Sequence, residues 1–237
     1  MFIFWCNIIK SIPLSWQTST ELKSFHKRDL VNVFNGLTTK SVYKCFVNFK
    51  CERPVSEIKF EQRYTVAKED WDDLYMIPYR ATCESHLIAF QFKVNHNILY
   101  TNEMLFKTGM VHSSSCSFCN AELETVDHML FNCFVLKPLW EYILNKYLSV
   151  IDVNINLCVK NVIFGLPEMS QTSVLINHII LIAKRYVYEC KLNKTRAHVN
   201  TFNRRLKSVM NVERKIAFEN GLLPRYEAKW NAIEHVV

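Results

Sequence analysis

The stretch CSFCNAELETVDHMLFNC, residues 116–133, decides the local fold because it gathers four side chains with metal-binding atoms within eighteen residues. Cys116 and Cys119 form a Cys-x-x-Cys turn, and His128 and Cys133 follow it. Such a turn directs both thiolates toward one ion, and the second pair closes a tetrahedral site from a short helical or looped segment. Three thiolates and one imidazole favour zinc over hard cations such as Mg²⁺. The spacing therefore predicts a zinc site.

Four protein ligands leave no open coordination position, so the zinc ion is expected to be structural and not catalytic. Thr125 is expected to cap the segment that carries His128, with Asp127 as a dipole partner or as an acceptor for the imidazole. The alternative is a chance cluster of three buried cysteines and a core histidine. A zinc deaminase is disfavoured, because Met129 follows the histidine where that chemistry requires a glutamate.

The composition favours a mainly α-helical protein. Only four glycines and six prolines occur among 237 residues, so turns should be few and the elements long. The opening segment has no basic residues before its apolar run, and the longest other apolar run, residues 174–183, is half the length of a membrane span. We therefore expect an intracellular protein of the cytoplasm and nucleus that is neither secreted nor inserted in a membrane.

Apolar residues at helical spacing predict several helices, and prolines and glycines predict their ends. Pro54 lies in a charged stretch that is typical of a linker, Pro78 predicts a helix stop, and Gly221 with Pro224 predicts the end of the last long helix. The predicted helices cover about residues 39–47, 83–99, 138–148, 173–192 and 199–220.

Positive charge is concentrated near the end of the chain. Between Lys184 and Lys229 there are twelve Lys and Arg residues against four Glu, a net charge of +8, whereas the whole chain carries +7. A segment with so large an excess of positive charge favours a polyanionic partner, most commonly one with phosphate groups. The alternative is a solubilising helical surface.

The sequence contains no convincing active site. Asp72 and Asp73 lie at a predicted helix start, where capping is favoured over two-metal catalysis. His86, His96 and His178 lie in apolar helical patterns, where a hydrogen-bonded core or surface histidine is the usual outcome. Gly-rich phosphate loops, Gly-x-Ser-x-Gly and His-Glu-x-x-His are not found. We therefore expect the chain itself not to be an enzyme.

The cysteine stretch and its flanks resemble the zinc-binding region of reverse transcriptases from LINE-type non-LTR retrotransposons. Residues 71–105 resemble the helical stretch before the zinc region in such proteins, and residues 175–206 resemble their basic helical tail. The residues that carry the resemblance in the zinc region are Cys116, Cys119, Glu124, Thr125, His128, Leu130, Phe131, Cys133 and Trp140.

This resemblance implies a helical connecting region at 1–82, a reverse transcriptase zinc-binding domain of Cys-Cys-His-Cys type at 83–150, and a basic helical tail at 151–237. The family's polymerase signature, Phe/Tyr-x-Asp-Asp, is missing from the chain. The resemblance therefore implies the non-catalytic C-terminal part of such a protein, which binds RNA, with DNA as a further candidate, next to the parent's polymerase domain. In the parent it would support target-primed reverse transcription.

The residues expected to contact nucleic acid belong to the basic tail, and aromatic stacking could come from Phe118 or Tyr188, although core packing is favoured for Tyr188. One alternative is a module that packs on a polymerase domain, suggested by the aromatic opening segment; another is a remnant reading frame without a selected role. The ten basic candidates are Lys184, Arg185, Lys191, Lys194, Arg196, Arg204, Arg205, Lys207, Arg214 and Lys215.

Overall fold

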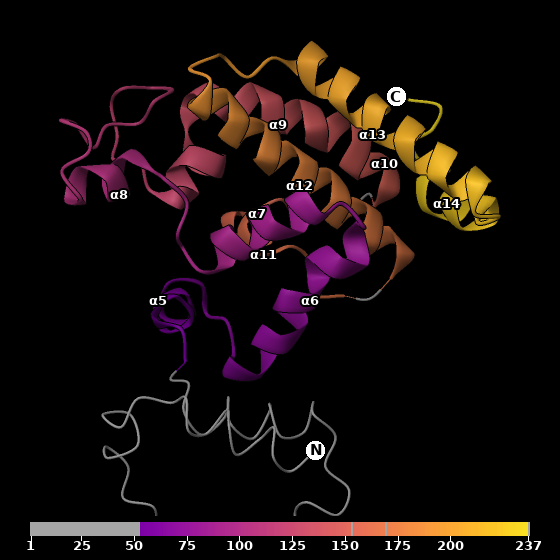
Figure 1. Ribbon diagram of the computed structural model, residues 1–237, viewed down its shortest axis with the longest axis horizontal. Coiled ribbons are helices and arrows are strands. Elements are labelled where there is room, and N and C mark those ends of the chain that lie inside the picture. The colour runs from indigo at the N-terminus through magenta and orange to yellow at the C-terminus, as the bar shows by residue number, and fades with distance from the viewer. Residues whose placement is uncertain (1–52, 153, 169, 237) are drawn as a thin grey trace, which may run out of the picture. The chain divides into compact units, whose positions relative to one another are not determined.

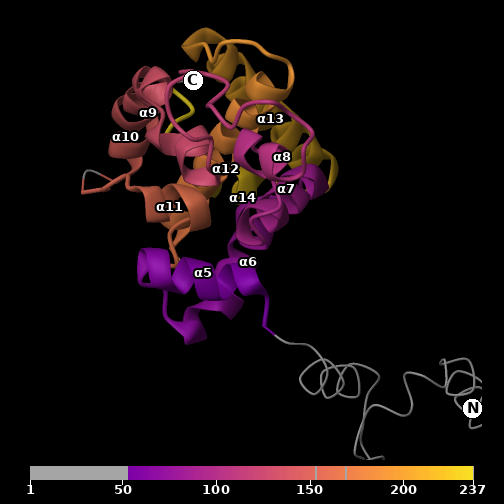
Figure 2. The same cartoon turned by 90° about the vertical axis from the view of Figure 1, so that its left-hand side faces the viewer.

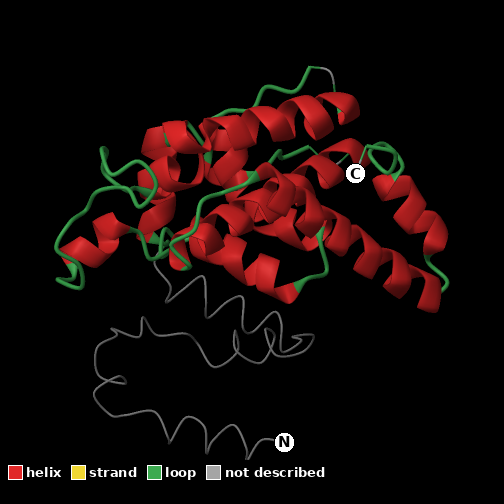
Figure 3. Ribbon diagram, turned by 90° about the horizontal axis from the view of Figure 1, so that it is seen from above, coloured by secondary structure: helices red, strands yellow, loops and turns green. Residues whose placement is uncertain are grey.

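The computed structural model describes residues 53–152, 154–168 and 170–236, and within these ranges the chain is helical with no β-strand (Figure 3). One isolated antiparallel bridge joins Ser115 and Leu123. The prediction of a mainly α-helical protein is confirmed. The predicted helix at 39–47 and the aromatic opening segment lie outside the described residues.

The helices follow one another with short connections. Two single turns, η1 and η3, are 3₁₀-helical, and two, η2 and η4, are π-helical. In chain order the elements are α5 (Val55–Tyr64), η1 (Lys68–Asp70), α6 (Trp71–Ala81), α7 (Ser85–Asn95), α8 (Asn102–Lys107), η2 (His128–Asn132), η3 (Phe134–Leu136), α9 (Lys137–Ile143), η4 (Leu144–Leu148), α10 (Ser149–Ile151), α11 (Val159–Phe164), α12 (Gln171–Leu192), α13 (Val199–Glu219) and α14 (Leu223–Trp230).

Helix α12 forms the centre of the hydrophobic core. It is apolar around most of its circumference, and such a helix is stable only when other elements cover it on several sides. Helices α6, α7, α11, α13 and α14 and the turn η2 all pack against it (Figures 1 and 2). The helix begins where the Ser173 N–H donates to the Ser170 hydroxyl at 3.0 Å, a side-chain cap. Because α12 lies in the middle, the zinc loop and the basic tail both pack against this helix and share one core.

The charged stretch after Pro54, predicted as a linker, is the helix α5. Its Phe60 is buried and meets the Phe164 ring of α11 edge to face, with the ring centroids 5.2 Å apart. Arg53 pairs with Glu57 and with a second glutamate one turn further on. The linker prediction was wrong because one buried aromatic side chain and local ion pairs are enough to hold the segment as a helix.

Two prolines act differently from the prediction. Pro78 lies inside α6, which continues to Ala81, and its carbonyl still accepts the Thr82 N–H at 3.1 Å. Proline removes one N–H donor from the helix ladder, but its buried ring packs in the core and α6 continues for three more residues. Gly221, at φ 68°, ends α13 as predicted, but Pro224 then occupies the first turn of the further helix α14.

The long predicted helices are confirmed, and α12 and α13 lie close to their expected bounds. Helix α7 ends four residues before the prediction, and the predicted helix at 138–148 is α9 followed by the π-helical turn η4. Among the described residues, no helix combines the length and the apolar character that crossing a bilayer requires. Core contacts join α6 to α7 and to α12, so residues on both sides of the predicted domain boundaries at 82/83 and 150/151 pack together. Those boundaries stay predictions.

Candidate metal centre

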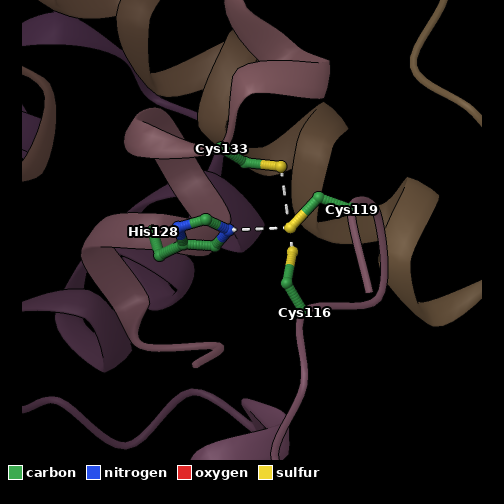
Figure 4. Close-up of side chains that lie close together, drawn as sticks. All are labelled: Cys116, Cys119, His128 and Cys133. Carbon is green, nitrogen blue, oxygen red and sulfur yellow. Dashed lines mark hydrogen bonds between the residues drawn. The ribbon is translucent and has the colours of Figure 1, made fainter. Parts of the chain in front are cut away.

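The side chains of Cys116, Cys119, His128 and Cys133 point into one common space (Figure 4), with their ligand atoms all within 4.8 Å of one another. The two thiol sulfurs of Cys116 and Cys133 are 3.8 Å apart, and the Cys119 sulfur is 3.4 Å from His128 Nε2. Zn–S and Zn–N bonds of usual length at tetrahedral angles give edges of about 3.8 Å and about 3.5 Å. A disulfide would need about 2.05 Å. The geometry therefore fits a tetrahedral zinc ion.

Local hydrogen bonds hold the two halves of this cluster. In the first half, the Asn120 N–H donates to the Cys116 carbonyl at 2.8 Å, with Asn120 in the left-handed region at φ 55°. In the second half, the Thr125 hydroxyl accepts the His128 N–H at 3.1 Å, which confirms Thr125 as the cap. The Cys133 N–H then donates to the His128 carbonyl at 2.9 Å. The ligands are therefore positioned by the backbone turns that carry them.

The imidazole is oriented by Glu122, a residue that the sequence did not single out. Its carboxylate oxygen lies 3.2 Å from His128 Nδ1, which leaves Nε2 toward the thiols. Asp127, the predicted partner, instead accepts a hydrogen bond from Arg63 at 2.8 Å. Glu122 thus takes the acceptor role that was predicted for Asp127. Asp127 lies in the first turn of the segment that Thr125 caps, and the alternative role of a helix-dipole partner stays a prediction.

The thiols of this cluster differ in acidity. Burial raises the pKa of Cys116 to about 12 and also raises that of Cys133. Burial acts in the same direction on Cys119, but hydrogen bonds from the backbone N–H groups of Glu122 and Ala121, together with those of His128 and Cys116, outweigh it and lower that pKa to about 6. Three thiolates so close together require a compensating positive charge, which a bound zinc ion supplies. The donor set and its surroundings thus fit zinc.

Glu124 connects the zinc loop to two helices. Its carboxylate is fully buried and accepts the N–H groups of Asn102, at the start of α8, at 2.7 Å and of Ser117, inside the loop, at 2.6 Å. The Lys191 ammonium of α12 lies 3.3 Å from the same carboxylate. The resemblance drew attention to Glu124 without giving it a role, and the structure makes it a positioning residue for the loop.

The structure corrects two of the ten predicted nucleic-acid contacts. Lys191 is buried against Glu124, and Lys184 is buried in the core, where its ammonium donates to Gln91 Oε1 at 2.6 Å and to the Ile163 carbonyl at 2.9 Å. Neither ammonium can reach a nucleic acid. Other helices cover α12 on several sides, so the side chains of Lys184 and Lys191 are buried although they are basic.

The other eight candidates differ in exposure. Arg185 and Arg205 are half-buried, and both pair with Glu189. Tyr188 is buried, which agrees with the core packing favoured from the sequence, so a nucleic-acid base cannot stack on its ring. The six exposed candidates are Lys194, Arg196, Arg204, Lys207, Arg214 and Lys215.

The buried ammonium of Lys184 makes stability depend on pH. Burial lowers its pKa from 10.5 to about 7, so between these values the unfolded chain binds more protons than the folded one. Stability should therefore rise with pH in this window and fall as pH drops toward 7. Between about pH 7.5 and pH 9 we expect the unfolding free energy of the wild type to rise by about 2 kcal/mol more than that of Lys184→Met. Urea denaturation at both pH values measures the difference; parallel pH profiles would contradict it.

The fold and the site define a helical protein with a closed cluster of three cysteines and one histidine. Residues 59–140, from α5 to α9, match the family model described as zinc-binding in reverse transcriptase, and all four candidate ligands lie inside the match. This supports a reverse transcriptase zinc-binding domain in that part of the chain. Neither a curated protein nor a solved structure matches the chain.

Proposed function

We propose that this chain is the non-catalytic, zinc-stabilised C-terminal part of a non-LTR retrotransposon reverse transcriptase, and that it binds RNA through the exposed face of α13. The observation that carries this proposal is a shallow, open patch of surface along that helix, formed by residues of α13 alone. Its basic side chains are Arg204, Lys207 and Lys215, and they lie together with the polar Ser208 and Asn211 and the apolar Val212.

The spacing of these side chains suits a nucleic-acid backbone. Lys207 and Lys215 follow Arg204 by three and eleven positions, which at 3.6 residues per turn places all three within about 80° of one another on one side of α13, in a stripe about 16 Å long. Neither Arg204 nor Lys207 takes part in an ion pair with another described residue, and Lys215 has only an exposed partner, Glu219, at 3.9 Å. Cations without buried partners can exchange their counterions for phosphates, which is the sequence-independent part of nucleic-acid binding.

The zinc centre supports this surface through the core. Glu124 ties the zinc loop to Lys191 on α12, and α12 packs against α13. A change in the zinc loop therefore acts on the helix that carries the basic stripe. In the parent protein we place this surface beside the polymerase domain, where it would hold template RNA during target-primed reverse transcription. Polymerisation itself is assigned to the parent and not to this chain.

The proposal predicts salt-dependent binding that requires the stripe. Arg204→Glu/Lys207→Glu/Lys215→Glu in the zinc-loaded full chain should weaken binding to single-stranded RNA at least about tenfold, and the slope of log affinity against log salt should shrink by about 2. Fluorescence anisotropy between about 50 and 200 mM salt measures both quantities. The control Lys59→Glu/Lys68→Glu/Lys93→Glu makes the same charge change at exposed positions outside α13. Equal affinity of the stripe variant and the wild type would refute RNA binding by α13.

A protein-interaction module is the second candidate function. The observation that favours it is a group of exposed apolar side chains at the end of α13 and just beyond it, Val212, Ile216, Phe218 and Leu222. Exposed apolar residues this close together often mark protein contacts. Salt-independent binding to a polymerase domain, together with unchanged RNA affinity in the stripe variant, would favour this function over the first.

A further inference from the structure

A half-open cavity of about 230 Å³ lies between the start of α7 and the helices α12 and α13. It borders the basic stripe, because Ser208 of α13 lines both the cavity and the open patch that carries the stripe. Arg204 of the stripe and Arg205 of the cavity are also neighbours in the chain. A strand bound along the stripe therefore lies next to this cavity.

The side of the cavity formed by α12 and α13 carries an uncompensated positive charge. Arg185 and Arg205 both line it, and both pair with one carboxylate, that of Glu189. Two guanidinium groups against one carboxylate leave one positive charge. Arg205 Nη1 has no hydrogen-bond partner among the described residues, although the Arg205 side chain as a whole is 35% exposed. Buried polar groups are nearly always paired, so this side of the cavity lacks an anionic acceptor.

The α7 side of the cavity carries a carboxylate, that of Glu84. Its Oε1 atom is buried and directed toward His178, at 3.7 Å from Nε2, so Oε2 is the oxygen that remains for a ligand. Oε2 lies 3.6 Å from Nε2 of the exposed His86, which is beyond the usual hydrogen-bond range. Neither arginine of the cavity pairs with Glu84 in the described part of the chain. A matching ligand therefore combines an anionic group with a hydrogen-bond donor.

We propose that this cavity binds one ribose-phosphate unit of the RNA strand, an inference that rests on the proposed function. The phosphate group lies against Arg205 and Arg185, and the neighbouring 2′-hydroxyl donates a hydrogen bond to Glu84 Oε2. Carboxylates are common partners of the ribose 2′-hydroxyl, for example in dinucleotide-binding folds. The same hydroxyl is the group by which a protein distinguishes RNA from DNA. Glu84 is thus assigned as the residue that selects RNA.

Glu84 acts against DNA as well as in favour of RNA. A carboxylate next to a phosphate chain repels it, and a ribose offsets this repulsion by donating a hydrogen bond to the carboxylate. Deoxyribose has no such donor, so the carboxylate faces a DNA strand without a partner. The Glu84 side chain is 26% exposed, which places the effect at the low end for a hydrogen bond to a charged group, about tenfold in affinity.

The test compares three single-stranded oligonucleotides of one sequence: RNA, its 2′-fluoro analogue and DNA with uracil in place of thymine. The 2′-fluoro group keeps the sugar conformation of RNA but cannot donate a hydrogen bond. Fluorescence anisotropy with the zinc-loaded full chain should show about tenfold tighter binding of RNA than of either analogue. In Glu84→Leu the three affinities should agree within about twofold. Glu227→Leu, the same change at an exposed position of α14, is the matched control and should keep the preference.

Arg205→Gln tests the phosphate half of the subsite. Loss of one phosphate contact should weaken binding of all three oligonucleotides and reduce the slope of log affinity against log salt by about 1. An unchanged slope would contradict a phosphate at Arg205.

The outcomes separate this inference from the proposed function. Equal binding of RNA and its 2′-fluoro analogue by the wild type, or a preference kept by folded Glu84→Leu, would overturn the subsite, while a loss of RNA affinity in the stripe variant would still support RNA binding by α13. Circular dichroism shows whether each variant is folded. If Glu84→Leu does not fold, the comparison of RNA with the 2′-fluoro analogue on the wild type still decides.

Discussion

Replacement of Cys133 by serine should remove the zinc ion and unfold the loop of residues 113–133. Cys133 is fully buried and contributes both a thiolate and core packing, so the variant loses the metal bond and leaves a hydroxyl among apolar groups. Structural zinc sites bind with apparent free energies of about 10–16 kcal/mol in small peptides, which is comparable with the whole stability of a domain, about 5–15 kcal/mol. We therefore expect the largest loss of stability of any single substitution considered.

Two measurements check this expectation. Hydrogen exchange is measured in the wild type with and without a chelator and in Cys133→Ser. Backbone amides of the loop, including those of η2, should lose protection first, because the metal ligands hold the turns of this segment. Cys158→Ser, a change at an exposed cysteine, is the control and should keep wild-type zinc content and exchange. Wild-type thermal stability after complete zinc removal would show that the cluster folds without metal.

Glu124→Gln should cost about 3–5 kcal/mol of stability even with zinc bound, because breaking a buried ion pair leaves the other charge uncompensated. The lone charge here is the Lys191 ammonium, whose side chain is only 7% exposed. The two carboxylate oxygens accept N–H groups from different residues, Asn102 and Ser117. Glutamine has a single acceptor oxygen, so its NH₂ group must face one of these donors.

Chemical denaturation in saturating zinc measures this loss. Glu141→Gln on α9 is the matched control: its side chain is 59% exposed and lies outside the metal site, and the same change there should cost well under about 1 kcal/mol. The double variant Glu124→Gln/Lys191→Met should recover part of the loss, since the orphaned charge is removed with its partner. Similar effects of Glu141→Gln and Glu124→Gln would contradict the ion-pair explanation.

Features that depend on neighbours in the chain could be predicted from the sequence. The four candidate ligands follow from spacing, because a Cys-x-x-Cys turn brings two thiols together whatever surrounds it. Helices α12 and α13 follow from apolar periodicity, and Gly221 at positive φ follows from the freedom of glycine in that region. The predicted cap at Thr125 is local in the same sense.

Features that depend on which helices meet were decided only by the tertiary structure. Lys184 and Lys191 belong to the basic segment in the sequence but are buried, because α12 is covered on several sides. Packing of α12 likewise brings the buried His178 near Glu84 and Glu213, residues that lie far apart in the chain and share no motif. Sequence spacing determined the zinc loop because its four ligands lie within eighteen residues of one another. The burial of the two lysines and the exposed basic face depend on helix packing, which long-range contacts alone establish.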